Sequence, residues 1–270
     1  AVEAGAIDEV SVDWLQSRAD GGVSAPRLDR SFIDEARRQD CRVFVTLTDY
    51  DETRHAFDPA ISAAILQTKE TRRRHAEAVA AWCRQHEVAG VDVDWEAVKG
   101  SGRDRFSAFV EELADRLHAD DRLIAVDVYP KMKEPGSWHG PRGQDWARLG
   151  RAVDQFRVMT YNYSGSWSGP GPLSPPEWID RVLTFAETQV PPRRIVMGLG
   201  FYGRAWRGAT TEDLTWDSIR AIRSAHEPRE SRTASRELLL EYRIDGDRHQ
   251  AYFPDAAAIR AKLRMMVSRH

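Results

Sequence analysis

The most informative part of this 270-residue sequence is a short acidic stretch, Gly90–Glu96, which reads GVDVDWE. Its β-branched residues predict a strand, and side chains alternate between the two faces of a strand. Asp92, Asp94 and Glu96 therefore share one face, at spacings of about 6–7 Å. Carboxyls this close cannot all ionise freely, so at least one keeps a proton, as a general acid must. Glu96 stands last, at the carboxyl end of the strand, and is the predicted acid.

Two other interpretations of the acidic stretch stay open. It could be a solvated edge strand with its acidic side chains in water, although the long helical patterns on both sides favour a central strand. It could also bind Mg²⁺ or Ca²⁺, which prefer carboxylate oxygens, but no further acidic cluster is connected to it by spacing. We expect no metal and no cofactor.

Short β-branched segments alternate with helical patterns through most of the chain, which predicts βα units around a parallel sheet. In such a sheet, ligand-binding loops follow the carboxyl ends of the strands. The helix expected over 103–118 has the clearest apolar stripe, from Phe106 to Leu117. Strands are expected over 9–15, 42–48, 90–96, 122–129, 156–161 and 194–201, and helices over 31–39, 71–87, 103–118, 176–189 and 254–268.

Residues 209–253 interrupt this alternation and are predicted to form an insertion. Within it, strands over 238–244 and 248–253 would turn at Gly246 to make a β-hairpin. We interpret the whole chain, 1–270, as a single domain, because α/β barrels routinely take about 250 residues.

Composition excludes several classes of protein. With 41% hydrophobic residues and a formal charge of −3, the chain is neither disordered nor basic enough to favour nucleic acid. No apolar run reaches the roughly 18 residues of a membrane span, and the first residues lack a signal-peptide pattern. Cys41 and Cys83 have no metal-ligand spacing and are predicted to be buried free thiols, with a single disulfide as the alternative. We expect a monomer.

Three segments carry a resemblance to a known family. Asp92–Glu96 resembles the Asp-x-Asp-x-Glu signature of glycoside hydrolase family 18, the chitinases and their relatives. Residues 158–162 (VMTYN) resemble the family's Met-x-Tyr-Asp strand, and residues 198–206 (GLGFYGRAW) its Gly-x-Pro-Phe-Tyr-Gly-Arg strand. The resemblance implies a (β/α)8 barrel of the TIM type. Only two predicted strands precede the acidic one and no eighth strand follows the last helix, so we expect the first and last strands of the barrel to be missing.

The resemblance also implies a retaining, substrate-assisted cleavage of β-1,4-linked N-acetylglucosamine (GlcNAc) polymers, without a protein nucleophile. Glu96 would protonate the glycosidic oxygen, Asp94 would orient the acetamido group, and Asp92 would share a proton with Asp94. Tyr161 would donate a hydrogen bond to the acetamido carbonyl. Further sugar contacts are expected from Met159, Asn162, Tyr202, Arg204 and Trp14, while Trp138, Trp167 and Trp206 could each stack on a sugar or pack in the core.

The sequence departs from the family in ways that bear on substrate. Asn162 replaces the usual Asp, which should move the pH optimum more than abolish activity. Residues 46–50 (TLTDY) replace a Ser-x-Gly-Gly motif and, with residues 162–172, favour the branch of bacterial spore-cortex and cell-wall N-acetylglucosaminidases. Peptidoglycan is then as good a candidate substrate as chitin, and we expect a secreted or cell-wall-associated protein. The alternative is a lectin-like relative with little catalysis, although such relatives commonly lose the acid that Glu96 provides here.

Overall fold

The computed structural model describes residues 7–269, which form two compact units. The first unit comprises residues up to 158 together with 185–196, and the second comprises 159–184 and the residues from 197 onward. That 1–270 acts as one catalytic domain stays a prediction.

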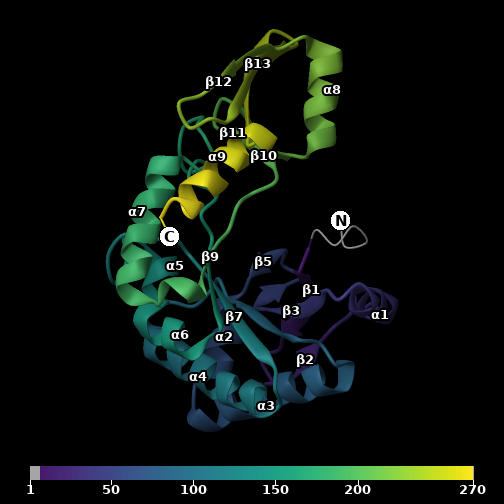
Figure 1. Cartoon of the computed structure of the whole chain (residues 1–270), viewed down its shortest axis with the longest axis vertical. Coiled ribbons are helices and arrows are strands. Elements are labelled where there is room, and N and C mark those ends of the chain that lie inside the picture. The colour runs from purple at the N-terminus through teal and green to yellow at the C-terminus, as the bar shows by residue number, and fades with distance from the viewer. Residues whose placement is uncertain (1–6, 270) are drawn as a thin grey trace. The chain divides into compact units, whose positions relative to one another are not determined.

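The first unit is built on a seven-stranded sheet (Figure 1). Strands β1, β3, β6, β7 and β8 pair in parallel, and the two-residue β2 runs antiparallel to β1. This confirms the predicted α/β class with a mostly parallel sheet, and in the described residues the sheet has two edges, β2 and β9, and is not closed. The order is β2 (Val23–Ser24), β1 (Glu9–Ser17), β3 (Arg42–Thr48), β6 (Gly90–Asp94), β7 (Leu123–Val128), β8 (Gln155–Val158) and β9 (Ile195–Met197).

The sheet is strongly curved. Strands β1 and β8 stand four strand spacings apart, which would be about 19 Å in a flat sheet. Nevertheless Arg157 Nη2 donates to Glu9 Oε1 at 2.9 Å, and Gln155 Nε2 donates to Glu9 Oε2 at 2.9 Å. The inner face therefore curls round a polar interior, as in a fold of the TIM-barrel type.

Helices cover the outer face of this sheet. Helices α3 and α4 lie side by side along it (Figure 1), and α4 buries the predicted stripe from Phe106 to Leu117. Three of the remaining helices have only four to eight residues, too short for a periodic pattern, and the sequence does not predict them. The helices are α1 (Arg30–Arg38), α2 (Pro59–Leu66), α3 (Lys69–His86), α4 (Arg103–Ala119), α5 (His139–Arg142) and α6 (Trp146–Ala152), with short strands β4 (Tyr50–Asp51) and β5 (Ala56–Phe57) after β3.

The second unit contains a five-stranded antiparallel sheet with α8 packed along it (Figure 1). The predicted hairpin is present, and its turn residue Gly246 has a φ of 91°, which glycine adopts without strain. The sheet begins at Gly203, before the predicted insertion. Its order is β11 (Thr210–Leu214), β10 (Gly203–Arg207), β14 (Asp247–Phe253), β13 (Leu238–Ile244) and β12 (Arg229–Arg232), with helices α7 (Pro176–Gln189), α8 (Trp216–His226) and α9 (Ala256–Val267) elsewhere in the chain.

Both cysteines are buried and free, as predicted. Burial raises the pKa of the Cys83 thiol to about 12, so this thiol is unreactive at neutral pH. Across residues 7–269, none of the helices combines the length and the apolar character needed to span a membrane.

A buried histidine links α3 to the start of the chain. His75 Nδ1 lies 3.1 Å from the carbonyl oxygen of Gly21, which can only accept, so Nδ1 donates and Nε2 accepts from the Ser17 hydroxyl at 3.2 Å. Trp95 Nε1 donates to the same hydroxyl at 3.1 Å. Burial lowers the pKa of His75 to about 4, so the imidazole is neutral in the folded protein.

We therefore expect acid to destabilise the protein through His75. The unfolded side chain takes up a proton near pH 6.5 and the folded one near 4, so stability present above pH 6.5 is lost as the pH falls through this window, by on the order of 3 kcal/mol. Urea unfolding at pH 7.5 and 4.5 would measure this loss. His75→Gln, which keeps one donor and one acceptor, should lose less on acidification than the wild type. Equal losses in both proteins would contradict the assignment.

Candidate active site

The acidic stretch leaves the strand earlier than predicted. Strand β6 ends at Asp94, so Asp92 and Asp94 lie on it, whereas Glu96 lies in an irregular segment, residues 95–99. The chain turns because Trp95 enters the core, where it is 1% exposed and stacks on Phe109 at 4.7 Å. The prediction that Glu96 continues the strand is wrong, and other contacts must hold it.

Asp49 supplies those contacts at the end of β3. Its Oδ1 accepts the backbone N–H of Glu96 at 3.1 Å, and its Oδ2 accepts that of Ala97 at 3.3 Å. The register of the sheet explains this, because Thr48 pairs with Asp94 and the next residues of both strands are neighbours. Asp49 is fully buried, and burial raises its pKa to about 7 while the two N–H groups oppose the rise.

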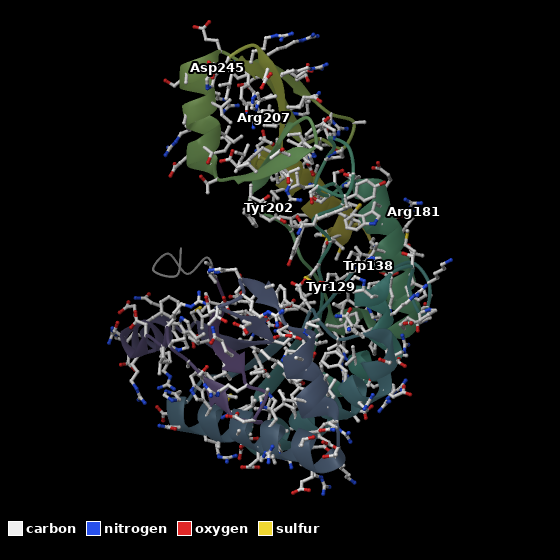
Figure 2. The ribbon with its side chains drawn as sticks, turned by 180° about the vertical axis from the view of Figure 1, so that it is seen from behind. Tyr129, Trp138, Arg181, Tyr202, Arg207 and Asp245 are labelled. Atoms are coloured by element: carbon white, nitrogen blue, oxygen red, sulfur yellow. The ribbon has the colours of Figure 1, made fainter. Side chains whose placement is uncertain are left out.

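Tyr129 holds the carboxyl of Glu96 from the other neighbouring strand. Its hydroxyl donates to Glu96 Oε2. Burial raises the pKa of Glu96 and this hydrogen bond works in the opposite direction. Burial and the charge of Glu96 raise the pKa of Tyr129, so it stays a donor. The Trp138 ring packs edge-on against Tyr129 at 4.6 Å, and Figure 2 shows the two side chains together.

Asp94 lies at the centre of a group of carboxyls. Its pKa is raised well above the ordinary value by burial and then by the charges of Glu96, Asp92 and Asp49. On β7, the pKa of Asp127 is likewise raised by burial and by Asp92 and Asp94. The Oδ1 atom of Asp94 is buried and has no hydrogen-bond partner among the described residues. A buried polar atom without a partner is costly, and a ligand that bonds to it would remove that cost.

Arg157 provides positive charge beside the innermost carboxyl. Its Nη1 pairs with Asp92 Oδ2 and also donates to Ser11 Oγ at 2.5 Å. Burial raises the pKa of Asp92, and Arg157 opposes this shift. Asp92 is therefore the carboxyl of the group best placed to stay ionised, which leaves Asp94 and Asp127 as the carboxyls driven toward the protonated form.

Except for Trp14, the remaining predicted sugar contacts lie in the second unit, and four of them form a cluster. Tyr202 Oη donates to Asn162 Oδ1 at 2.5 Å, and Arg204 Nη2 donates to the same oxygen at 3.1 Å. The Tyr161 ring meets Tyr202 edge-on at 6.3 Å. Met159 is buried in the same unit. The predicted strand over 156–161 ends at Val158, so Met159, Tyr161 and Asn162 lie on the loop that follows it, whereas Arg204 lies on β10.

The tryptophans have different environments. Trp14 is half-buried and packs edge-on against Phe32 of α1 at 5.8 Å. Trp167 is 66% exposed and lies under the Arg204 guanidinium, whereas Trp206 is 2% exposed and packs with Tyr252. Trp206 is thus a core residue and stacking on sugar there is wrong; a sugar contact by Trp14 stays a prediction.

Sequence reasoning missed four polar residues of the first unit: Asp49, Asp127, Tyr129 and Arg157. The available signal was the parallel register. Val93 pairs with Val126, so continuing the alignment places Asp127 beside Asp94 and Tyr129 beside Glu96. That signal needs the strand order, which the sequence alone does not contain.

A mostly parallel, curved sheet of the TIM-barrel type, with carboxyls gathered at the carboxyl end of a central strand, is typical of α/β glycoside hydrolases. The chain belongs to Glycosyl hydrolases family 18, whose family model matches residues 33–270.

Individual relatives agree with this assignment. The chain is 23% identical to the glycosylase YvbX of Bacillus subtilis over 69% of this chain and 55% of the relative, and 24% identical to the cortical fragment-lytic enzyme of B. subtilis over 93% and 60%. It thus spans little more than half the length of these relatives. A chitinase structure from Chromobacterium violaceum superposes with a TM-score of 0.91 at 22% identity, over 98% of this chain and 84% of that one.

Proposed function

We propose that the protein is a retaining glycoside hydrolase that cleaves β-1,4-linked GlcNAc polymers with help from the substrate's own acetamido group. The observation that carries this proposal is Asp94, a partly exposed carboxyl between Asp92 and Glu96 whose Oδ1 atom is buried and has no partner among the described residues. A neutral acetamido N–H is a suitable ligand for that oxygen, and Glu96 lies next to it as the acid.

The proposed chemistry has two steps. Glu96 gives its proton to the glycosidic oxygen as the C1–O bond breaks, and the acetamido oxygen forms a bond to C1, giving an oxazolinium ion. Water then attacks C1, Glu96 takes the water's proton, and the acetamido group is restored. The configuration at C1 is retained because both attacks invert it. Asp94 orients the acetamido group and, once ionised, stabilises the positive oxazolinium; Asp92 shares a proton with it.

The family resemblance extends the proposal to sugar contacts. Tyr161 donates to the acetamido carbonyl, and Met159, Asn162, Tyr202, Arg204 and Trp14 contact the sugar. Because Asn162 Oδ1 already accepts from Tyr202 and Arg204, its amide nitrogen is the group left to donate to a sugar oxygen in this proposal. An amide does not titrate, so this position contributes no ionisation to the pH profile.

Chitin and peptidoglycan glycan are the two candidate polymers, because the relatives and neighbours include a chitinase and a cortical fragment-lytic enzyme. Both substrates lie outside the cytoplasm, which agrees with a secreted or cell-wall-associated protein.

Product analysis tests the proposal. The purified protein is incubated with chitohexaose and with peptidoglycan, and the products are followed by mass spectrometry and by proton NMR of the new reducing end. Early release of the β-anomer is expected, and the preferred substrate identifies the polymer. Release of the α-anomer would overturn the retaining mechanism. Binding without turnover on either substrate would favour the lectin-like alternative.

Removing the Tyr129 hydroxyl should shift the pH dependence. The hydrogen bond favours ionised Glu96, so Tyr129→Phe raises the pKa of Glu96 further. The acid must be protonated for bond cleavage, so the basic limb of kcat/KM against pH should move to higher pH. The control is Tyr163→Phe, since Tyr163 is exposed and packs on Trp178. An unchanged basic limb in Tyr129→Phe would show that the hydroxyl does not act on Glu96.

A further inference from the structure

We propose that Asp49 is the positioning residue for the acid: by binding the backbone N–H groups of Glu96 and Ala97, it presents the Glu96 carboxyl to the leaving-group oxygen. This inference rests on the proposed function. Asp49 does not touch the reacting atoms, and its effect passes through the segment that carries Glu96.

No regular secondary structure holds the segment that carries Glu96. Strand β6 ends at Asp94, and residues 95–99 belong to neither a helix nor a strand. Their N–H groups therefore need other acceptors. Asp49 binds two successive N–H groups with its two oxygens, at 3.1 and 3.3 Å, which determines both the position and the direction of the peptide between Glu96 and Ala97.

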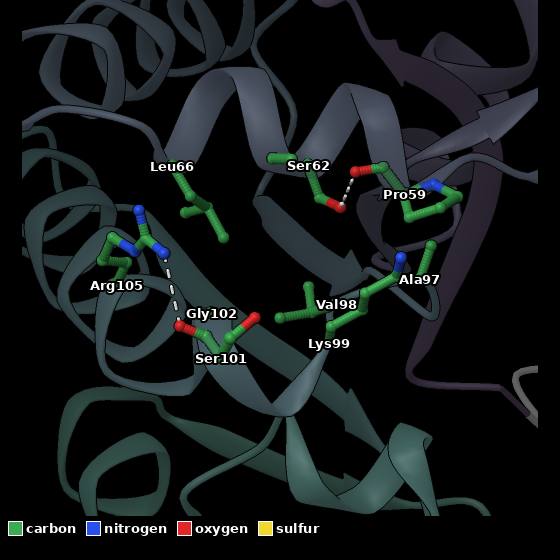
Figure 3. Close-up of a pocket in the computed structure, with 10 residues that line it drawn as sticks. Pro59, Ser62, Leu66, Ala97, Val98, Lys99, Ser101, Gly102 and Arg105 are labelled. Atoms are coloured by element: carbon green, nitrogen blue, oxygen red, sulfur yellow. Dashed lines mark hydrogen bonds between the residues drawn. The ribbon is translucent and has the colours of Figure 1, made fainter.

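A hollow of about 150 Å³ lies on the other side of the segment, lined by Ala97 and Val98 and by Pro59, Ser62 and Leu66 of α2 (Figure 3). Packing against α2 is therefore incomplete at residues 97–99. The hydrogen bonds to Asp49 add contacts to the segment that this packing supplies only in part.

A carboxylate is costly at the position of Asp49. Asp49 is fully buried, and its partners are neutral groups: the two N–H groups and the Ser62 hydroxyl. An unpaired buried carboxyl costs free energy unless it is hydrogen-bonded. The adjacent N–H groups of Glu96 and Ala97 each need an acceptor, and the Asp49 carboxyl supplies two acceptor oxygens.

The test exploits leaving-group chemistry. Asp49→Asn keeps one acceptor oxygen but turns an NH₂ group toward the second N–H, so the segment shifts while the volume is unchanged. A displaced acid matters for a sugar leaving group, which needs protonation, and hardly at all for dinitrophenolate, which leaves without it. kcat/KM reports the steps through bond cleavage. It should fall roughly 10- to 100-fold for a chitooligosaccharide and less than about threefold for the dinitrophenyl glycoside of GlcNAc oligomers.

The control is Asp154→Asn, because Asp154 Oδ2 accepts the backbone N–H of Ile124 at 2.9 Å at the opposite end of the sheet. This variant should leave both kcat/KM values within about twofold of wild type. Equal falls for both leaving groups in Asp49→Asn would overturn the proposal, because a general distortion of the site would produce them; so would unchanged values. A wild-type protein without turnover on either compound would instead refute the proposed function itself.

Discussion

Replacing Glu96 by Gln should lower kcat/KM for chitooligosaccharides by roughly 10²- to 10⁴-fold, the contribution expected of a general acid. The glutamine side chain matches the size of the carboxyl and can still accept the hydrogen bond from Tyr129, so the fold and sugar binding should survive. The fall in kcat/KM therefore measures the loss of the transferable proton and not a change in the shape of the site.

The leaving group distinguishes this loss from damage to the site. Dinitrophenolate departs without protonation, so kcat/KM for a dinitrophenyl glycoside should change little in Glu96→Gln. Its kcat should fall, because the oxazolinium then lacks the base that activates water. Glu111→Gln is the matched control: Glu111 lies on α4 and pairs with Arg148, outside the acidic group, and its replacement should alter neither value. Undiminished turnover of chitooligosaccharides by Glu96→Gln would refute the mechanism.

The parts of this protein that the sequence predicts are those encoded locally. The alternation of faces in 90–94 places Asp92 and Asp94 together, and the apolar stripe of α4 identifies its buried side. The six predicted strands correspond to β1, β3, β6, β7, β8 and β9. The turn at Gly246 identifies the hairpin of the second unit.

The parts that escaped prediction depend on contacts between distant segments. Glu96 leaves the strand because Trp95 packs on α4 and Asp49 captures the backbone, and neither cause is visible within 90–96. Tyr129 meets Glu96 only through the β6–β7 register. Local patterns thus predict which residues are present, whereas strand order and register decide which of them meet.

Asp94→Asn should be about as damaging as the loss of the acid, with a different pattern. Attack by the acetamido oxygen creates positive charge in every substrate, so kcat/KM should fall roughly 10²- to 10³-fold for the chitooligosaccharide and for the dinitrophenyl glycoside alike. An Asn side chain can accept the acetamido N–H but cannot become an anion beside the oxazolinium. The matched control is Asp13→Asn, which removes a more distant carboxyl whose charge also raises the pKa of Asp94.

The direction of the pH effect strengthens this test. The pKa of Asp94 is raised by burial and by its acidic neighbours, so wild-type activity should fall as protonation of Asp94 becomes complete on the acidic side. Asp94→Asn removes that ionisation, and its residual kcat/KM should lose the acidic limb while keeping the basic limb set by Glu96. Asp13→Asn should retain both limbs of the pH profile. Its acidic limb should move to lower pH, because a charge that raises the pKa of Asp94 is removed. An acidic limb that persists unchanged in Asp94→Asn would assign that ionisation to another group and remove Asp94 from the proposed mechanism.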